Sequence, residues 1–274
     1  GKSKAAGFRP MSLLGGLLPV YRQVISELAA VGAKWIQIDE PILVTDLPKE
    51  TRDELTDAYH QLAAAAPNVC LCFTTYFGGL GDYLPDVLRL PVAAVHLDLV
   101  RAPEQLETAL ELVPERMMLS LGVIDGRNVW RTDLERALAM IEKAVARIGN
   151  DRVMVGPSCS LLHCPIDLDE ETQFDAELRS WLAFAKQKLQ EVATLVRAVN
   201  RGRQAVADAL AASSAALASR ARSQRIHSPA VKQRLAAVTP EMFRRASPDH
   251  IRRQKQREKI KMPLMATNNI GSVP

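Results

Sequence analysis

The chain has 274 residues, of which 47% are hydrophobic and 24% are charged, so neither a disordered nor a collagen-like protein fits its composition. Four cysteines are too few for a disulfide scaffold and are typical of a reducing compartment, so we expect a cytoplasmic protein. No run of about 18 apolar residues is present, and we therefore expect no membrane-spanning helix and no membrane partner.

The formal net charge of +4 conceals two regions of opposite sign. Residues 197–262 carry 16 Lys and Arg against 4 Asp and Glu, whereas the rest of the chain carries 19 against 27. A basic region binds nucleic acid in some proteins and covers an acidic protein surface in others. Phe243 is the only aromatic residue between 197 and 262, so bases have no rings to stack on, and we expect no nucleic-acid partner.

Helical and strand-like segments alternate along the first part of the chain. Apolar residues at helical spacing predict a helix over 20–30, with Gly32 as its C-cap. Five short, continuously apolar runs follow as predicted strands, at 35–38, 69–73, 93–97, 117–122 and 152–156. Helical patterns lie between them, including 103–112 and 132–148, and Thr132 is the expected N-cap of the latter. This alternation predicts a parallel sheet covered by helices.

The strand spacing favours one α/β fold. Strand starts recur roughly every 25–35 residues, the length of a βα unit, and polar or glycine residues follow each strand. No G-x-G-x-x-G or G-x-x-x-x-G-K-[ST] motif follows any strand, so nothing indicates a dinucleotide or P-loop site. We expect a partial (β/α)8 TIM barrel of about five βα units, whose unpaired edges make the isolated chain prone to aggregation.

The last third of the chain is predicted to be helical, with an uncharged end. The predicted helices are 170–200, 204–219, 228–238 with Ser228 as N-cap, and 248–261. Residues 263–274 carry no charge, and their pattern indicates the opening strand of a further domain. We therefore divide the chain into a barrel segment, a basic helical linker and this strand, at 1–196, 197–262 and 263–274.

Candidate functional residues lie where the predicted strands end. Asp39 and Glu40 are candidates for a general acid or base, or for a structural ion pair. Adjacent side chains of a strand point to opposite faces, so only one of the two faces the barrel axis. His96 and Asp98 share a face, but they provide at most two ligands, fewer than the three that a catalytic zinc needs.

The cysteines offer a second kind of site. Cys70 and Cys72 place their sulfurs on one strand face, and together with Cys159 and Cys164 they could bind zinc. The C-x-C spacing differs from that of structural zinc sites, so buried thiols are the favoured interpretation. Cys159 and His163 are also a candidate nucleophile and base, although a loop histidine more often serves in hydrogen bonding.

The loop after the fourth predicted strand is the most distinctive. Its sequence over residues 122–131 is G-x3-G-R-N-x-W-R. The glycines allow the backbone to approach a ligand closely, and Arg127 and Arg131 offer forked donors for a carboxylate or phosphate. Interlocking of neighbouring loops by Arg and Asn side chains explains the same residues at least as well.

Several of these segments occur in the same order in one protein family. They are 35–41 (WIQIDEP), 74–77 (TTYF), 96–100 (HLDLV), 126–131 (GRNVWR), 158–165 (SCSLLHCP), 225–231 (RIHSPAV) and 270–272 (IGS). Through them, nearly the whole chain resembles cobalamin-independent methionine synthase.

The resemblance implies an enzyme of methionine biosynthesis that transfers a methyl group from 5-methyltetrahydropteroyltri-L-glutamate to the thiol of L-homocysteine. Members of the family contain two (β/α)8 barrels, and zinc in the second barrel activates the thiol. The chain resembles the later part of the first barrel, the linker and the first strand of the second barrel. It is therefore expected to be a fragment of a monomeric parent enzyme that binds homocysteine, the methyl-folate polyglutamate and zinc.

Carried over residue by residue, the resemblance assigns contacts with homocysteine to Ile270, Gly271 and Ser272. The zinc ligands of the family have no counterpart here, so we expect no metal site, no catalytic residue and no activity of the chain alone. The strand-end residues are expected to be structural or vestigial: Asp39, Glu40, Asp98, Asn128, Cys159 and His163. The alternative is a non-catalytic binding or scaffold module, derived from a barrel, that docks a partner through its basic tail.

Overall fold

The computed structural model describes residues 8–261 and 263. They form two compact units, one of residues 8–222 and one of residues 223–261 with 263. Residues 197–222, which the sequence pattern assigns to the linker, belong to the first unit. The division at 196/197 and 262/263 that the charge pattern suggests stays a prediction.

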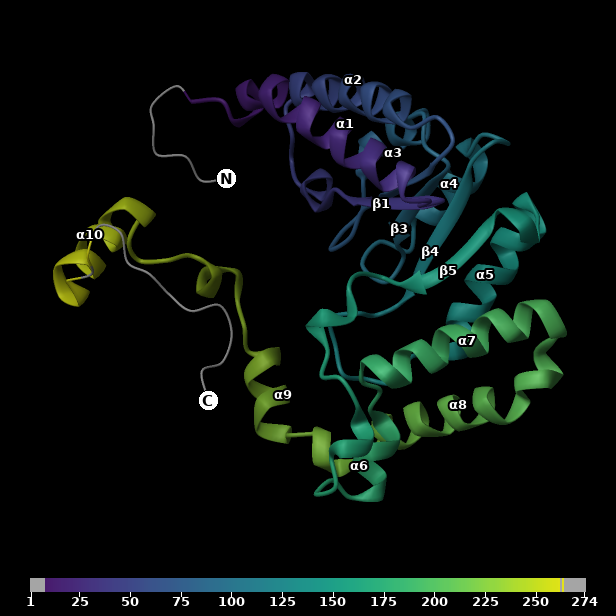
Figure 1. Cartoon of the computed structure of the whole chain (residues 1–274). Coiled ribbons are helices and arrows are strands. Elements are labelled where there is room, and N and C mark those ends of the chain that lie inside the picture. The colour runs from purple at the N-terminus through teal and green to yellow at the C-terminus, as the bar shows by residue number, and fades with distance from the viewer. Residues whose placement is uncertain (1–7, 262, 264–274) are drawn as a thin grey trace. The chain divides into compact units, whose positions relative to one another are not determined.

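The first unit is built around a five-stranded parallel sheet (Figure 1). Its strands are β1 (Trp35–Asp39), β2 (Cys70–Thr74), β3 (Ala94–Asp98), β4 (Met118–Ile124) and β5 (Val153–Pro157). They lie side by side in chain order, each paired in parallel with the next. The α/β class and all five predicted strands are confirmed. Parallel strands in sequential order, with helices between them, are the arrangement found in a (β/α)8 barrel.

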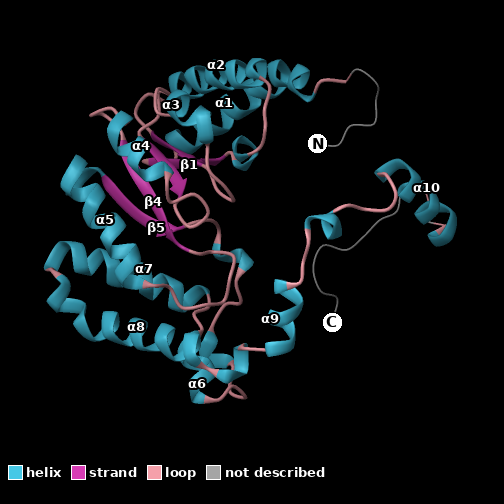
Figure 2. Cartoon of the chain, turned by 180° about the vertical axis from the view of Figure 1, so that it is seen from behind, coloured by secondary structure: helices cyan, strands magenta, loops and turns pink. Residues whose placement is uncertain are grey.

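Helices precede, connect and follow the strands. In the first unit they are α1 (Leu14–Ala30), α2 (Lys49–Ala65), α3 (Leu84–Val87), α4 (Gln105–Leu112), α5 (Leu134–Ile148), α6 (Ala176–Trp181), α7 (Ala185–Arg201) and α8 (Ala207–Arg222). Figures 1 and 2 show α1, α2 and α3 beside the β1 end of the sheet, and α5 and α7 beside the β5 end.

The predicted N-cap of α5 is wrong by one residue. The side chain of Asp133, not that of Thr132, accepts the hydrogen bond from the backbone N–H of Arg136. The backbone N–H of Thr132 donates instead to the carboxylate of Glu191 on α7, at 3.0 Å. Thr132, which the local pattern favours as the cap, is thus bonded to a distant helix instead.

The long helix predicted over 170–200 begins only at Ala176 and is divided into α6 and α7. Between them, residues 182–184 leave the helical path and pair with the loop that follows β4. Trp130 and Leu182 form an antiparallel bridge, and the N–H of Ala183 donates to the carbonyl of Val129 at 2.9 Å. Apolar periodicity does not reveal this break, because residues 182–184 are themselves buried and apolar.

The two faces of the sheet differ in polarity. On one face, buried apolar side chains of the central strands pack with the helices in one core; they are Phe73, Val95, Leu97, Leu119 and Leu121. Alternate residues face the other way, and one line across the paired strands is polar: Asp39, Thr74, His96 and Ser120. The second face, here called the polar face, therefore provides the candidate site.

The second unit contains α9 (Pro229–Ala236) and α10 (Asp249–Ile260), neither of which has a buried residue. Ser228 is the N-cap of α9, as predicted, and its hydroxyl accepts a hydrogen bond from the N–H of Val231. The predicted homocysteine contacts Ile270, Gly271 and Ser272 lie outside the described residues. Over the described part of the chain, no helix has the length and apolar character needed to span a membrane.

Candidate functional site

A polar cavity of about 430 Å³ lies on the polar face of the sheet, towards the carboxyl ends of the strands. Every strand contributes to its lining, with Asp39, Thr74, His96, Ser120 and Gly156. Loops after β2 and β5 add Tyr76 and Cys159. The carboxyl ends of the strands are where α/β barrels place their ligands, so the cavity is the candidate site of this chain.

Asp39 and Glu40 point to opposite faces, as predicted. Asp39 lines the cavity and accepts hydrogen bonds from the amide of Gln37 at 2.7 Å and from the hydroxyl of Tyr76 at 3.2 Å. Glu40 accepts a hydrogen bond from the hydroxyl of Tyr59 on α2, at 3.0 Å. Burial raises the pKa of the Glu40 carboxyl. Asp39 is thus the carboxylate that a ligand in the cavity can reach, whereas Glu40 joins the sheet to α2.

His96 is buried beneath the cavity, with 7% of its surface exposed. Its Nδ1 is hydrogen-bonded to the hydroxyl of Ser120 at 2.8 Å. Burial lowers the pKa of the imidazole below its usual value of about 6.5, so the ring is neutral at pH 7. A Cβ added at Gly122 would lie 2.8 Å from Nε2 of His96. Only glycine therefore allows β4 to lie this close to the ring.

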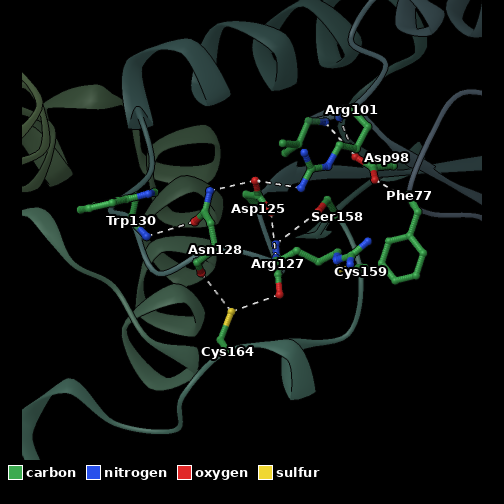
Figure 3. Close-up of polar contacts among 12 residues, drawn as sticks. Phe77, Asp98, Arg101, Asp125, Arg127, Asn128, Trp130, Ser158, Cys159 and Cys164 are labelled. Carbon is green, nitrogen blue, oxygen red and sulfur yellow. Dashed lines mark hydrogen bonds and ion pairs between the residues drawn. The ribbon is translucent and has the colours of Figure 1, made fainter. Parts of the chain in front are cut away.

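Asp98 joins the loops that follow β2 and β3 (Figure 3). Its carboxylate accepts three backbone hydrogen bonds, from Phe77 at 2.9 Å, Val100 at 3.0 Å and Arg101 at 2.9 Å. Phe77 has a φ of 76°, a left-handed conformation that is unfavourable for a residue with a bulky side chain. Asp98 is 1% exposed, so its carboxylate holds these loops and does not face a ligand.

Phe77 also connects several side chains beside the cavity. Its ring contacts those of Tyr76 and His163 edge-on, with centroid distances of 4.7 and 5.5 Å. The guanidinium of Arg127 lies 4.3 Å from the centroid of the same ring (Figure 3). His163 thus packs against Phe77. Burial raises the pKa of the Cys159 thiol, so this thiol stays protonated at pH 7. The structure does not show the candidate pair of Cys159 and His163 as an activated nucleophile and base.

The loop after β4 is held by hydrogen bonds within itself and by Cys164 (Figure 3). The side-chain amide of Asn128 donates to Asp125 at 2.8 Å, and its oxygen accepts from the N–H of Trp130 at 3.0 Å. The thiol of Cys164 donates to two backbone oxygens of the loop, at 3.1 and 3.2 Å. The side chain of Asn128 thus fixes its own loop, and the link to a neighbouring loop comes from Cys164. Cys164 acts there as a hydrogen-bond donor.

Lys188, which is outside the predicted set, also fixes this loop. It lies on α7 with no exposed surface, and its ammonium donates to Asn128 Oδ1 at 3.2 Å and to the carbonyl of Trp130 at 3.0 Å. Burial lowers the pKa of this amine. The sequence does contain a signal: Lys188 follows Phe184 and precedes Leu195 on the apolar stripe of the helix. A charged side chain at such a position needs a buried polar partner.

The described residues do not fit the zinc ion that the family resemblance implies. Within residues 8–261 and 263, no three His, Cys, Asp or Glu side chains come together as a metal site requires. The four cysteines are free thiols, and Cys72 lies 3.6 Å from the hydroxyl of Thr74. Because no group of three such donors is found among the described residues, no zinc chemistry is assigned to the cysteines.

Sequence comparison identifies the family. Residues 1–149, more than half of the chain, match the family described as "Cobalamin-independent synthase, N-terminal domain". The chain belongs to this family. The resemblance found in the sequence motifs is thereby confirmed.

Relatives in the cobalamin-independent synthase family cover the whole chain. A 5-methyltetrahydropteroyltriglutamate–homocysteine methyltransferase of Caulobacter vibrioides is 57% identical over 273 residues, which are 100% of this chain and 35% of that protein. A protein of the same name from Nitrobacter winogradskyi is 53% identical over 274 residues, 100% of this chain and 36% of that protein. Among solved structures, a B12-independent methionine synthase from Shewanella sp. W3-18-1 is 14% identical, with a TM-score of 0.46 over 73% of this chain and 58% of that one. The chain spans about a third of the length of the curated relatives it matches.

Proposed function

We propose that the chain is part of an enzyme that transfers a methyl group from 5-methyltetrahydropteroyltriglutamate to homocysteine and so forms methionine. The observation that carries this proposal is the 57% identity with the Caulobacter vibrioides methyltransferase, over the whole of this chain. The match includes both the sheet with its polar cavity and the helices that follow it. The parent enzyme is proposed to be a cytoplasmic monomer.

The described residues supply a cavity and fixed loops, but no activated thiol or thiol-activating group. Methyl transfer to homocysteine requires its thiolate. The carboxylate of Asp98 is occupied by three backbone N–H groups, and the Cys159 thiol is protonated at neutral pH because burial raises its pKa. We therefore expect the chain alone to form no methionine, and the zinc ion used by the family to lie outside the described residues.

The assignments made from the sequence stand as proposals within this enzyme. Ile270, Gly271 and Ser272 are proposed to contact homocysteine, and residues 1–196, 197–262 and 263–274 to be barrel segment, linker and first strand of a second barrel. A structural or vestigial role is proposed for Asp39, Glu40, Asp98, Asn128, Cys159 and His163. The hydrogen bonds of Glu40 to Tyr59 and of Asn128 to Asp125 support this role.

A chimera tests the proposed function. The 273 matching residues of the Caulobacter vibrioides protein are replaced by this chain, and methionine formation from homocysteine and 5-methyltetrahydropteroyltriglutamate is measured in the presence of zinc. We expect a rate within about tenfold of the unmodified enzyme, a difference of no more than ~1.4 kcal/mol in the barrier. A folded but inactive chimera contradicts the proposal. Methionine formed by the 274-residue chain alone contradicts the placement of thiol activation outside it.

A further inference from the structure

A second cavity, of about 240 Å³, lies where the loop after β4 meets the start of α5 and the end of α8. We call it the arginine pocket, because Arg131, Arg136 and Arg220 line it together with Trp130. Loop, helix start and helix end each supply one of the three arginines. All of them belong to the first unit, and none lines the polar cavity.

The positive charge of the pocket is not neutralised by its own carboxylates. Asp125 accepts from the N–H of Arg127 and the amide of Asn128, both at 2.8 Å, and its ion-pair partner is Arg101 at 3.7 Å. Asp133 caps α5.

Among the described residues, no carboxylate oxygen lies within 4.0 Å of a guanidinium nitrogen of the three arginines. Arg131 affects the pKa of Glu191 only over a longer distance, and burial is the main influence on that carboxyl. The pocket therefore retains a net positive charge.

Arg220 adds an independent observation. Its guanidinium lies 4.6 Å from the centroid of the Trp130 ring, which holds it in place. Its Nη1 is buried, yet it has no hydrogen-bond partner in the described part of the chain. A buried donor of a charged group without an acceptor is unfavourable and rare in folded proteins.

The start of α5 offsets the negative charge of the carboxylate that caps it. This helix has 15 residues and begins directly after Asp133, so the positive end of its dipole lies at the pocket, which Asp133 and Arg136 line. Arginine forks are suited to oxyanions. The three arginines thus favour this class of ligand.

We propose that the arginine pocket binds a small oxyanion with two or more negative charges, of the phosphate or polycarboxylate type. Its volume of about 240 Å³ lies below the roughly 300–1,000 Å³ of sites for drug-sized ligands, which favours a small anion. The arginines provide bidentate contacts to its oxygens. Binding in this pocket is independent of the proposed methyl transfer.

Titration of the full 274-residue chain tests the proposal. Inorganic phosphate and citrate are added separately, with ionic strength kept constant by chloride, and binding is followed by calorimetry and by tryptophan fluorescence, because Trp130 lines the pocket. We expect saturable binding of at least one of the two anions. Arg220→Met and Arg136→Met should each raise its Kd at least about tenfold.

Arg127→Met is the matched control, because Arg127 also stacks on an aromatic ring but lies outside the pocket. It should change the Kd less than about twofold. Arg136 is exposed, so its variant tests the proposal even if Arg220→Met fails to fold. Binding of phosphate alone, or of citrate alone, supports the proposal and identifies the type of anion. It is overturned if neither anion saturates by about 10 mM, or if Arg127→Met weakens binding as much as Arg136→Met.

Discussion

The polar cavity and the arginine pocket differ in how their charged and polar groups are satisfied. Around the cavity, Asp98 accepts three backbone hydrogen bonds and His96 is bonded to Ser120. In the pocket, by contrast, Arg220 keeps a buried N–H without an acceptor. A polar residue at a strand end can thus be used entirely in shaping loops. A charged or polar group that lacks a partner is then a better guide to where a ligand binds than a polar residue at a strand end.

The largest expected effect of breaking a satisfied group is at Asp98. Asp98→Ala leaves three backbone N–H groups without their acceptor and removes the bond that holds Phe77 in a left-handed conformation. We expect the free energy of unfolding to fall by at least about 3 kcal/mol in urea denaturation. Asp46→Ala, at an exposed position, should change it by less than about 0.5 kcal/mol. Equal effects of the two variants would show that Asp98 does not hold the loops.

Lys188 provides the next largest effect. Lys188→Met keeps most of the buried side-chain volume but leaves the carbonyl of Trp130 without a donor, while Asn128 Oδ1 retains only the N–H of Trp130. We expect a loss of about 2 kcal/mol in the free energy of unfolding. The control is Lys34→Met at an exposed position, which should be nearly neutral. A Lys188→Met protein as stable as the control protein would mean that the loop does not depend on these bonds.

His96 should make stability depend on pH. Its folded-state pKa is lowered by burial, so below the unfolded-state value of about 6.5 the unfolded chain binds more protons than the folded one. Its contribution is therefore complete above that value and is lost as the pH falls. We expect about 1 kcal/mol of this loss between roughly pH 7.5 and 5.5.

The matched variant His96→Gln isolates this contribution. It can still bond to Ser120 but does not titrate, so the slope of unfolding free energy against pH should decrease in this range. Asp39 and Asp98 remain nearby in both proteins, and their charges act on the His96 pKa. An unchanged slope would show that His96 titrates equally in both states.

Glu40 is expected to give the smallest effect, and its contribution to stability changes with pH in the opposite direction to that of His96. Its folded-state pKa is raised by burial, so stability decreases as the pH rises from the unfolded-state value, about 4.3, through the folded-state value. Glu40→Gln still accepts the hydrogen bond from Tyr59, and it should equal or exceed the native stability at pH 7, by less than about 1 kcal/mol. Urea denaturation at pH 7 and 5 measures this against exposed Glu115→Gln. A clear loss at pH 7 would contradict the burial argument.

The sequence reveals the strands and the opposite directions of Asp39 and Glu40, because both depend on neighbours in the chain. Apolar runs and side-chain alternation are local properties. The bond partners were not predictable, because they are distant in sequence: Lys188 contacts Asn128 across 60 residues, and Asp98 contacts Phe77 across 21. The break between α6 and α7 likewise depends on pairing with Val129. Local sequence patterns thus predict the fold, whereas the hydrogen-bond partners of each charged group are seen only in the structure.

Thermal unfolding with and without phosphate and citrate, in the native chain and two variants, tests the contrast between the two cavities most directly. We predict that one of these anions raises the Tm of the native chain and of Asp39→Asn by the same amount, about 2 °C or more. Asp39 lines the polar cavity and Arg136 the arginine pocket, so the increase should be absent in Arg136→Met. No increase with either anion in the native chain, or an increase that Asp39→Asn removes and Arg136→Met retains, would contradict the account.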